Sequence, residues 1–547
     1  MQTVAIGSAL DFFPMEKQRP AQHAALDFIT QAVLDGKTDI VIAAPTGVGK
    51  SAIGAATALW AGSYDVAGCI TGGYYLVTQK MLQDQLEHDF PRYLPQFRNR
   101  AASLKSAIEY PCSKWGNCMA GRLAGIKDKA KKCIQRNPTD RTCPYLLTRA
   151  SFNMADMAIT NYSYLFTEHL HVGELGPRNF VICDEAHTLD KQITGFVEVL
   201  IDKDALDNWA PGVRPVPKMD AIEDFGAWVG SKYLAAGNER LGMLTENLSL
   251  NPTNNKMQAE YDRLKNHLSR LEYAVDEIMA SPADWVYWQE RVEGEWQCIA
   301  KPLSPAPFVP TMINQMGSTR LYMSAYLGPK DVFCRTLGLN RSKTAWLELD
   351  SAFAADKRSI HMTTVGSMGR AMADQTLPKL LQMCTTILDS HPDEKGIIHT
   401  HTYALGKRVY DHLLKTTSGS RLLFATNAAE RGTLFTEHTV SLEPTVLISP
   451  SMTEGYSFDD DLARFQIIVK CPYPYLGDRQ VKARMEQDRD WFTLQTVMSL
   501  LQTCGRLVRN ENDHGETYVL DSDVVRLFDE NDKFLPPWFK AAFKFYN

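Results

Sequence analysis

Short apolar runs, separated by amphipathic stretches, dominate the hydrophobic pattern of the chain. The first run, residues 38–48, is rich in β-branched residues and enters a glycine-containing turn. Residues 49–61 follow it and are rich in Ala and other small residues, which favours a helix. A strand, a loop and a helix in this order form the first unit of an α/β domain with a parallel sheet. Further strands of this domain are predicted at residues 74–78, 157–160, 180–185 and 320–325.

A second set of apolar runs lies late in the chain and predicts a second α/β domain, with strands at residues 396–401, 445–450, 465–470 and 517–521. Between the two sets, residues 191–300 are mostly helical in pattern. The clearest helix follows Asn251-Pro252, and its apolar residues repeat at alternating spacings of four and three: Met257, Tyr261, Leu264, Leu268, Leu271, Val275 and Ile278. Such a stripe predicts a helix packed against a neighbour within the domain, with a coiled coil to a partner chain as the alternative.

Length, composition and charge narrow the class of protein. At 547 residues, about three to five domains are expected. The chain is 44% hydrophobic and 22% charged, which excludes global disorder. Its net charge of −6 excludes a polybasic nucleic-acid coat but permits a local basic groove. We expect a cytoplasmic location, because no apolar run reaches the ~18–20 residues of a membrane span and the N-terminal residues lack signal-peptide features.

Residues 44–51 carry the first chemical motif, a P-loop with Ala at the first Gly position: Ala44, Pro45, Thr46, Gly47, Val48, Gly49, Lys50 and Ser51. Small residues let backbone N–H groups wrap around phosphates, and the following helix presents its positive N-terminus. Lys50 is predicted to reach the β- and γ-phosphates, and the Ser51 hydroxyl to ligate Mg²⁺.

Two further motifs complete a nucleotide site. Asp184-Glu185-Ala186-His187 follows a buried strand, so Asp184 is predicted to hold Mg²⁺ from the outer coordination sphere and Glu185 to polarise the attacking water. His187 is expected to link the site to neighbouring loops. Near the C-terminus, Gln502 precedes two arginines, Arg506 and Arg509, which are predicted to share one helical face and to stabilise charge on the γ-phosphate.

The 11 cysteines divide into two groups. A disulfide framework is not expected in a reducing compartment. Seven are scattered in apolar stretches and are interpreted as small buried hydrophobic residues: Cys69, Cys183, Cys298, Cys334, Cys384, Cys471 and Cys504. The other four, Cys112, Cys118, Cys133 and Cys143, have the spacing C-x5-C-x14-C-x9-C, which on its own fits either a [4Fe–4S] cluster or a tetrahedral zinc ion.

The segment that holds the four clustered cysteines is basic. Residues 101–150 contain ten Lys and Arg residues against three acidic ones, a local charge of +7. This favours contact with nucleic-acid phosphates, with a solvated surface as the alternative. Tyr110 and Trp115 are candidates either for stacking on bases or for packing around the cysteines.

Taken in order, APTGVGKS, DEAH and QTCGRLVR resemble the motifs of superfamily 2 helicases, and the cysteines between the first two resemble the XPD/DinG branch. Smaller matches cover nearly the whole chain: Arg19-Pro20-Ala21-Gln22, which resembles an adenine-reading motif, and residues 76–86, 155–166, 324–327, 396–405, 451–458 and 471–474. The chain departs from the family at Tyr326, where Thr is usual, and at Ser457, where Asp is usual. Both lie in motifs that couple ATP hydrolysis to strand movement in the family.

The resemblance implies an α/β fold with two RecA-like P-loop motor domains, an inserted iron–sulfur domain and a mainly helical arch domain. The expected boundaries are 1–100, 151–190 and 301–335 for the first motor domain, 101–150 for the iron–sulfur domain, 191–300 for the arch and 336–547 for the second motor domain. The implied cofactors are ATP, Mg²⁺ and a [4Fe–4S] cluster, which the position of the cysteines favours over zinc. Gln22, Glu454 and Gly455 join the nucleotide-binding set, and the implied catalytic residues are Lys50, Glu185, Gln502, Arg506 and Arg509.

The implied activity is ATP-dependent DNA unwinding with 5′→3′ polarity, by a chain favoured to be a monomer. Expected partners are single-stranded DNA, tailed duplex DNA and DNA:RNA hybrids, in DNA repair or another pathway of DNA metabolism. One alternative is a DNA-dependent ATPase that removes proteins or R-loops with little unwinding. Another is a cluster-bearing module that binds nucleic acid or senses redox state. A fused exonuclease is not expected, because only ~43 residues precede the P-loop.

Overall fold

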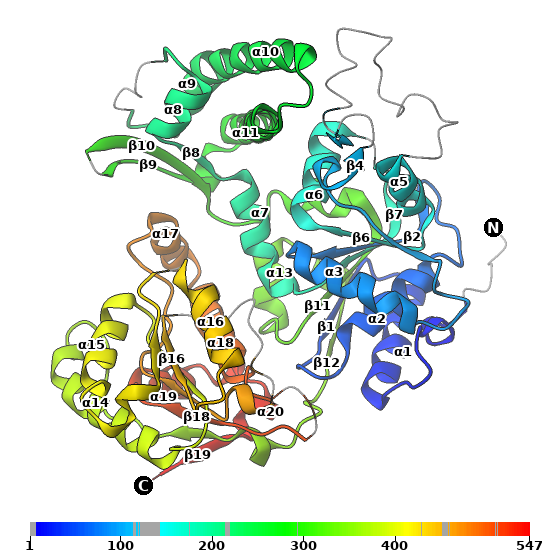
Figure 1. The fold of residues 1–547 in the computed structure, drawn as a ribbon. Helices are drawn as coiled ribbons and strands as arrows, with labels where there is room; N and C mark the ends of the chain where they lie inside the picture. Colours follow the sequence, from blue (N-terminus) through cyan, green and yellow to red (C-terminus); the bar gives the residue numbers. More distant parts are fainter. Residues whose placement is uncertain are drawn as a thin grey trace. The chain divides into compact units, whose positions relative to one another are not determined.

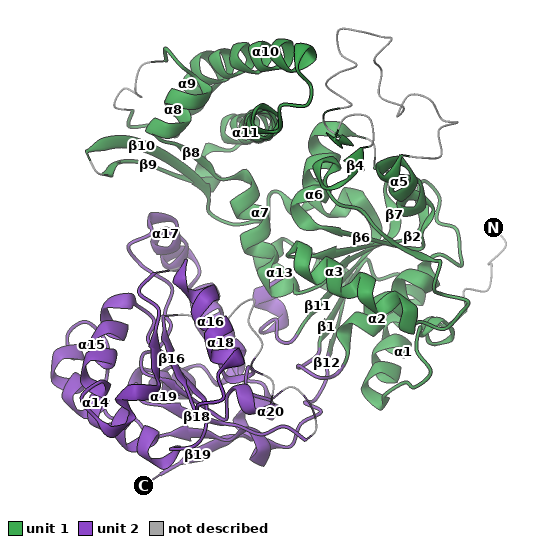
Figure 2. Cartoon of the chain, in the orientation of Figure 1, with its two compact units in different colours: residues 1–43, 49–324, 334–347 green, residues 44–48, 325–333, 348–547 purple. Residues whose placement is uncertain are grey.

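The computed structural model describes the chain apart from residues 1–6, 113–115, 119, 121–142, 174, 214–218, 293, 428, 451–457, 459, 509, 511 and 547. The chain divides into two compact units, coloured separately in Figure 2. The first unit comprises residues 1–43, 49–324 and 334–347, and the second comprises residues 44–48, 325–333 and 348–547.

A seven-stranded sheet forms the centre of the first unit, in the order β12-β1-β11-β7-β2-β6-β3. Its strands are β1 (Asp39–Ala43), β2 (Ile70–Val77), β3 (Ala101–Ser103), β6 (Met157–Asn161), β7 (Arg178–Cys183), β11 (Gly317–Ser324) and β12 (Thr344–Glu348). From β1 to β3 the neighbours pair in parallel. Every residue of β1 and β7 is buried, as expected for central strands of a parallel sheet covered on both faces. All five strands predicted in this region are present.

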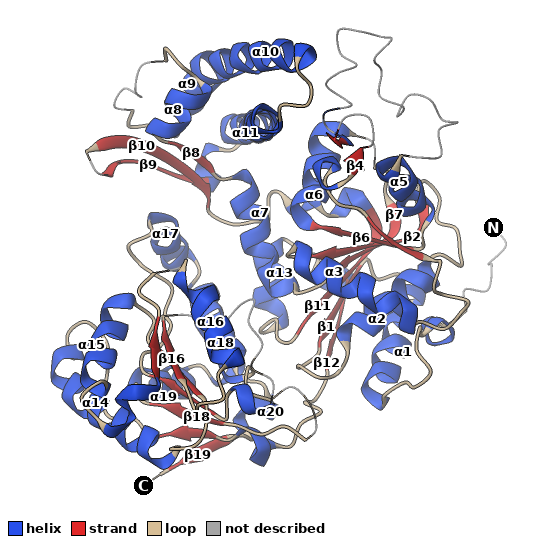
Figure 3. Cartoon of the chain, viewed as in Figure 1, coloured by secondary structure: helices blue, strands red, loops and turns tan. Residues whose placement is uncertain are grey.

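Helices flank this sheet (Figures 1 and 3): α1 (Pro20–Leu34), α2 (Lys50–Ala61), α3 (Lys80–Asp89), α5 (Pro144–Met154), α6 (Tyr162–Thr167), α7 (Leu189–Val197) and α12 (Val309–Met312). Helix α13 (Lys330–Leu337) is divided between the two units. The predicted helix after the P-loop is α2. Its residues from Ala52 to Ala61 are all buried, and most of them are small, so the helix lies close to the sheet. A short hairpin, β4 (Pro111–Cys112) and β5 (Gly116–Asn117), precedes α5.

A helical insertion lies between β7 and β11 in the chain and contains α8 (Lys203–Trp209), α9 (Ile222–Trp228), α10 (Leu234–Leu250) and α11 (Asn255–Ala280). The heptad prediction is confirmed by α11, which packs within the unit. Gly237 of α10 is so close to α11 that a Cβ atom there would lie 2.5 Å from the Leu268 side chain. The glycine therefore permits the two helices to approach each other.

The insertion also contains a sheet that the helical pattern did not predict. Strands β8 (Val199–Ile201), β10 (Glu295–Pro302) and β9 (Trp285–Val292) form an antiparallel sheet in the order β8-β10-β9. The turn between β9 and β10 contains Gly294, whose φ of +88° favours glycine. The description of residues 191–300 as mostly helical is therefore incomplete, because a hairpin occupies their last part.

The second unit is built on another seven-stranded sheet, in the order β15-β16-β14-β17-β18-β13-β19, with parallel pairing throughout. Its strands are β13 (Ile360–Met362), β14 (Gly396–His399), β15 (Leu422–Phe424), β16 (Val446–Ser449), β17 (Phe465–Ile468), β18 (Glu516–Val519) and β19 (Phe543–Phe545). The four strands predicted late in the chain are β14, β16, β17 and β18, so the prediction of a second α/β domain is confirmed.

The helices of the second unit cover both faces of its sheet. They are α14 (Ala373–Ser390), α15 (Tyr403–Leu413), α16 (Glu430–Val440), α17 (Arg479–Gln487), α18 (Arg489–Cys504), α19 (Ser522–Glu530) and α20 (Pro537–Lys540). One buried cluster joins α18 and α19 to the sheet, and a separate cluster joins α14 and α15 to it. Two parallel α/β sheets with helical cover match the predicted fold class.

Candidate active site

The P-loop joins the end of β1 to the start of α2. Gly47 and Gly49 both have a φ of +88°, a left-handed conformation that other residues rarely adopt. Gly49 is also the N-cap of α2, and no side chain caps this helix end by a hydrogen bond. The positive end of the helix dipole therefore faces the loop. This strand–loop–helix geometry is the one in which a P-loop binds phosphates.

Gln22 lies directly against the P-loop. Its side chain is buried, and its Oε1 accepts a 2.9 Å hydrogen bond from the backbone N–H of Arg19 at the start of α1. Its amide nitrogen is only 2.4 Å from the point where a Cβ atom on Gly49 would lie. The backbone conformation favours glycine at position 49, and the Gln22 side chain reaches the nucleotide loop.

Asp184 follows β7 and is held at both carboxylate oxygens. The Tyr75 hydroxyl donates to Asp184 Oδ2 at 3.0 Å, and the backbone N–H of Glu185 donates to Asp184 Oδ1 at 3.0 Å. Burial and the nearby charge of Glu185 raise the pKa of Asp184 to about 6, whereas Lys50 and the two hydrogen bonds act in the opposite direction. The ammonium group of Lys50 is thus within electrostatic reach of the carboxylate.

Glu185 contacts the end of a neighbouring strand. Its φ of +48° is unusual for a residue other than glycine, which shows that the backbone is constrained after β7. Its Oε2 lies 3.2 Å from His187 Nδ1 and 3.5 Å from the hydroxyl of Ser324, the last residue of β11. His187 Nδ1 and Ser324 Oγ are 2.7 Å apart. The DEAH residues and the SAYL segment therefore meet because β7 and β11 are adjacent strands.

The oxygen atoms beside Asp184 suit a magnesium ion. The Tyr75 hydroxyl of β2 donates to Asp184. Ser51 lies in the first turn of α2, which packs against β2. A hydroxyl and a carboxylate, completed by phosphate oxygens and water, are the ligands that Mg²⁺ prefers. The two side chains assigned to Mg²⁺ from the sequence therefore fit that ion.

Two tyrosines of this site were not singled out from the sequence. Tyr75 and Tyr162 are both fully buried, and the Tyr162 hydroxyl donates to the backbone carbonyl of Asp184 at 2.8 Å. A phenol inside an apolar strand is a usable signal, because a buried hydroxyl needs a hydrogen-bond partner. The partner itself is not readable, since it lies on a strand distant in sequence.

In the second unit, the structure corrects one prediction. Helix α18 contains Gln502 but ends at Cys504, where the N–H of Gly505 closes the last turn on the Leu501 carbonyl at 2.9 Å. Arg506 follows this helix end and is not part of the helix. The prediction that Arg506 lies on a helical face shared with Arg509 is therefore wrong. Burial lowers the pKa of His399, the last residue of β14, and the charge of Arg506 lowers it further.

Several predicted site residues lie outside the described part of the chain. They are Arg509, Glu454, Gly455, Ser457, Cys133 and Trp115. Three of the clustered cysteines are described: Cys112 in β4, Cys118, which is buried, and Cys143, which is the N-cap of α5. Among the described residues, no group of three or more His, Cys, Asp or Glu side chains is arranged to bind a metal ion. Of the scattered cysteines, Cys69 and Cys504 are partly exposed and the other five are buried.

The cysteine segment, predicted as residues 101–150, is hydrogen-bonded to the helical insertion. Asn117, in β5, donates from Nδ2 to Oε1 of Gln258, a fully buried residue near the start of α11, at 2.9 Å. Farther along α11, Arg270 donates to the carbonyls of Phe196 and Gly195, in α7, at 2.7 and 2.9 Å. Helix α11 is thus attached both to the cysteine segment and to the helix that follows the DEAH residues.

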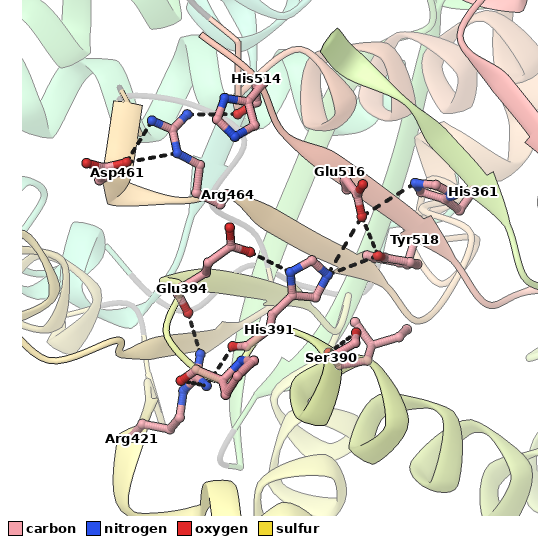
Figure 4. A network of polar contacts seen from close by, with 12 residues as sticks. His361, Ser390, His391, Glu394, Arg421, Asp461, Arg464, His514, Glu516 and Tyr518 are labelled. Atoms are coloured by element: carbon pink, nitrogen blue, oxygen red, sulfur yellow. Dashed lines mark hydrogen bonds and ion pairs between the residues drawn. The ribbon is translucent and has the colours of Figure 1, made fainter. Parts of the chain in front are cut away.

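A second polar network lies in the other unit (Figure 4). His391 precedes β14; its Nδ1 is 2.6 Å from Glu394 and its Nε2 is 2.9 Å from the Tyr518 hydroxyl. Glu516, the first residue of β18, lies within ion-pair distance of both His391 and His361. No sequence motif predicted this network.

Comparisons with known proteins find matches to helicase families and to individual helicases. Residues 384–542 match the family described as Helicase C-terminal domain, and residues 126–206 match the family DEAD_2. The chain is 20% identical to the "ATP-dependent DNA helicase YoaA" of Haemophilus influenzae, over 92% of this chain and 91% of that protein. It is 32% identical to the "General transcription and DNA repair factor IIH helicase subunit XPD" of Schizosaccharomyces pombe, over only 16% of this chain and 12% of that protein.

Solved structures show the same fold. A structure titled "XPD_Helicase" matches with a TM-score of 0.64 and 14% identity, over 97% of this chain and 100% of that one. The structure of S. tokodaii Xpd4 matches with a TM-score of 0.55 and 12% identity, again over 97% and 100%. Separately, none of the helices among the described residues is long and apolar enough to cross a membrane.

Proposed function

Because the chain belongs to the XPD/DinG-like helicases of superfamily 2, we propose that it is an ATP-dependent DNA helicase that moves 5′→3′ along single-stranded DNA and unwinds tailed duplexes or DNA:RNA hybrids. The observation that carries the proposal is the meeting of P-loop and DEAH residues at one edge of the first sheet, where Asp184 lies within electrostatic reach of Lys50. Lys50 and Ser51 are assigned to the phosphates and the metal ion, and Glu185 to the attacking water.

In this proposal, each described side chain has one task in ATP hydrolysis. Lys50 offsets negative charge on the β- and γ-phosphates, and Asp184 and Ser51 hold the ion, while Mg²⁺ neutralises charge on the phosphate oxygens when it is bound. Glu185 orients a water molecule and accepts its proton, and His187 keeps the Glu185 carboxylate in place from 3.2 Å.

The remaining assignments rest on the family resemblance. Gln22 is assigned to the adenine base, and Glu454 and Gly455 to the nucleotide. Gln502, Arg506 and Arg509 are assigned to the γ-phosphate, where guanidinium groups stabilise developing charge.

We assign the four clustered cysteines, Cys112, Cys118, Cys133 and Cys143, to a [4Fe–4S] cluster. Cys118 is buried, and Cys143 is the N-cap of α5. Iron, sulfide and zinc content of anaerobically purified protein tests the assignment. Four iron and four sulfide per chain are expected, and one zinc per chain would show a zinc site instead.

Strand displacement by anaerobically purified protein tests the activity, with ATP, Mg²⁺ and duplexes that carry either a 5′ or a 3′ single-stranded tail. Unwinding only from the 5′ tail is expected. Unwinding only from the 3′ tail would reject the polarity, and absence of nucleic-acid-stimulated ATP hydrolysis would reject the motor function.

One observation favours a second candidate, a DNA-dependent ATPase that displaces proteins or R-loops with little unwinding. Tyr326, at the position where the family has Thr, donates a hydrogen bond to the Phe534 carbonyl within the second unit. A side chain engaged in this way is less available for coupling ATP hydrolysis to strand movement. Rapid DNA-stimulated ATP hydrolysis without strand displacement from either tail would support this candidate.

A further inference from the structure

Tyr75 is a buried polar side chain for which the proposed reaction has no role. It lies in β2, pairs with Ile182 of β7, and is fully buried. Its hydroxyl donates a 3.0 Å hydrogen bond to Oδ2 of Asp184, in the DEAH group. One phenol oxygen therefore orients a carboxylate that is assigned to the metal ion.

Helix α2 leaves space for the Tyr75 ring by having a glycine at position 54. A Cβ atom on Gly54 would lie 2.5 Å from Tyr75 Cε2 and 2.7 Å from Met323 Cε, so even alanine would displace the ring. Glycine inside a helix is less favourable than alanine. This close contact explains why residue 54 is glycine. It also limits how far the Tyr75 ring can move from the sheet towards α2.

Asp184 is fixed by three hydrogen bonds. The Tyr75 hydroxyl holds Oδ2, the Glu185 N–H holds Oδ1, and the Tyr162 hydroxyl holds the main-chain carbonyl. Both carboxylate oxygens are therefore oriented before any ion binds. Groups held in their bound orientation lose less conformational entropy on binding, so such hydrogen bonds increase metal affinity.

We propose that Tyr75 is a positioning residue that sets the orientation of the Asp184 carboxylate and thereby sets the affinity of the nucleotide site for Mg²⁺. The inference rests on the proposed function, since that function assigns Asp184 to the ion. Tyr75 touches neither the nucleotide nor the water in this proposal; it acts through Asp184.

The experiment compares Tyr75→Phe with Tyr162→Phe in the full chain. Both changes remove one hydroxyl from a fully buried phenol beside Asp184, but only the first removes a bond to the carboxylate. Binding of a fluorescent non-hydrolysable ATP analogue is titrated with Mg²⁺, and again in EDTA. Melting temperatures report folding.

We expect Tyr75→Phe to raise the Mg²⁺ concentration for half-maximal binding by roughly tenfold, with unchanged affinity in EDTA. Tyr162→Phe should change the Mg²⁺ requirement less than about twofold. An unchanged requirement in Tyr75→Phe, or an equal shift in both variants, overturns the proposal in favour of a purely structural tyrosine. Failure of the proposed function looks different: the unaltered protein would bind the analogue equally well with and without Mg²⁺, or would not bind it.

Discussion

The two sheets are alike in topology but concentrate their polar side chains at opposite ends. In the first unit, Asp184 and Ser324 lie where β7 and β11 end. In the second unit, the network of Figure 4 lies where strands begin: His391 and Glu394 precede β14, and Glu516 starts β18. Ligands of open parallel sheets bind beyond the carboxyl ends of the strands. The arrangement in the first unit therefore suits a reaction site, whereas the network in the second unit suits stabilisation of the fold.

The same division exists within the first unit. Arg178, the first residue of β7, is 1% exposed and donates to four backbone carbonyls, those of Thr71, Phe152, Asn153 and Ala155. At the other end of the same strand lies Asp184. One strand thus begins in a structural anchor and ends in the candidate active site, so substitutions at its two ends should have separable effects.

Lys50→Ala, at the carboxyl end, should give the largest effect on activity. Removal of a charge aimed at the phosphates should lower ATP hydrolysis by about 10²–10³-fold and abolish unwinding, while DNA binding and the melting temperature persist. Lys407→Ala, at an exposed lysine of α15, is the matched control. Loss of DNA binding in Lys50→Ala would indicate a folding defect rather than a catalytic one.

Arg178→Met, at the amino end, should give the opposite result. Four carbonyls lose a charged donor in a buried site, which should cost about 3 kcal/mol of stability. The ATPase rate per folded molecule should stay within about twofold of the original. Chemical denaturation followed by activity of the native fraction measures both. An ATPase loss that exceeds the loss of folded protein would contradict the division between the two ends.

Mild acid should destabilise the second unit through a histidine at the carboxyl end of its sheet. Burial lowers the pKa of His399, at the end of β14, to about 4. Unfolding lets this histidine bind a proton below about pH 6.5, so stability should fall as the pH drops from 6.5 towards 4. At pH 5 the loss from this residue should be about 2 kcal/mol relative to pH 7. His399→Gln should flatten the pH dependence of denaturant unfolding by that amount; an unaltered dependence would show that His399 is already charged in the native state.

Glu394→Gln should give the smallest effect. Its contact with His391 is 2.6 Å long, but the Glu394 side chain is 41% exposed, and such pairs contribute less than about 1 kcal/mol. ATP hydrolysis should not change. A loss of stability clearly above about 1 kcal/mol would show that the network of the second unit is more cooperative than its exposure indicates.

The strands and motifs were predictable because their signals are local. Apolar β-branched runs predicted nine strands, and the glycines of the P-loop predicted a turn between a strand and a helix. The hairpin 285–302 was not predicted, because its aromatic and charged residues fit neither period clearly. Contacts such as Tyr75 with Asp184 or Arg178 with Phe152 join strands and loops far apart in sequence, and only the register of the sheet brings them together. The helix end before Arg506 had a local signal, because Gly505 favours a helix C-terminus. The three-residue spacing of the arginines instead favoured a helix that continues through both.

Helix α11 is attached at two separated points and can transmit a rotation from one to the other. Arg270 attaches it to the end of α7, which follows the DEAH residues, and Gln258 attaches its far part to Asn117 of the cysteine segment. The twelve residues between these two points span about 18 Å of rigid helix. A rotation of about 5° at the Arg270 attachment would therefore displace the Gln258 end by about 1.6 Å. The length of this helix therefore gives a small rotation at α7 a larger displacement at the cysteine segment.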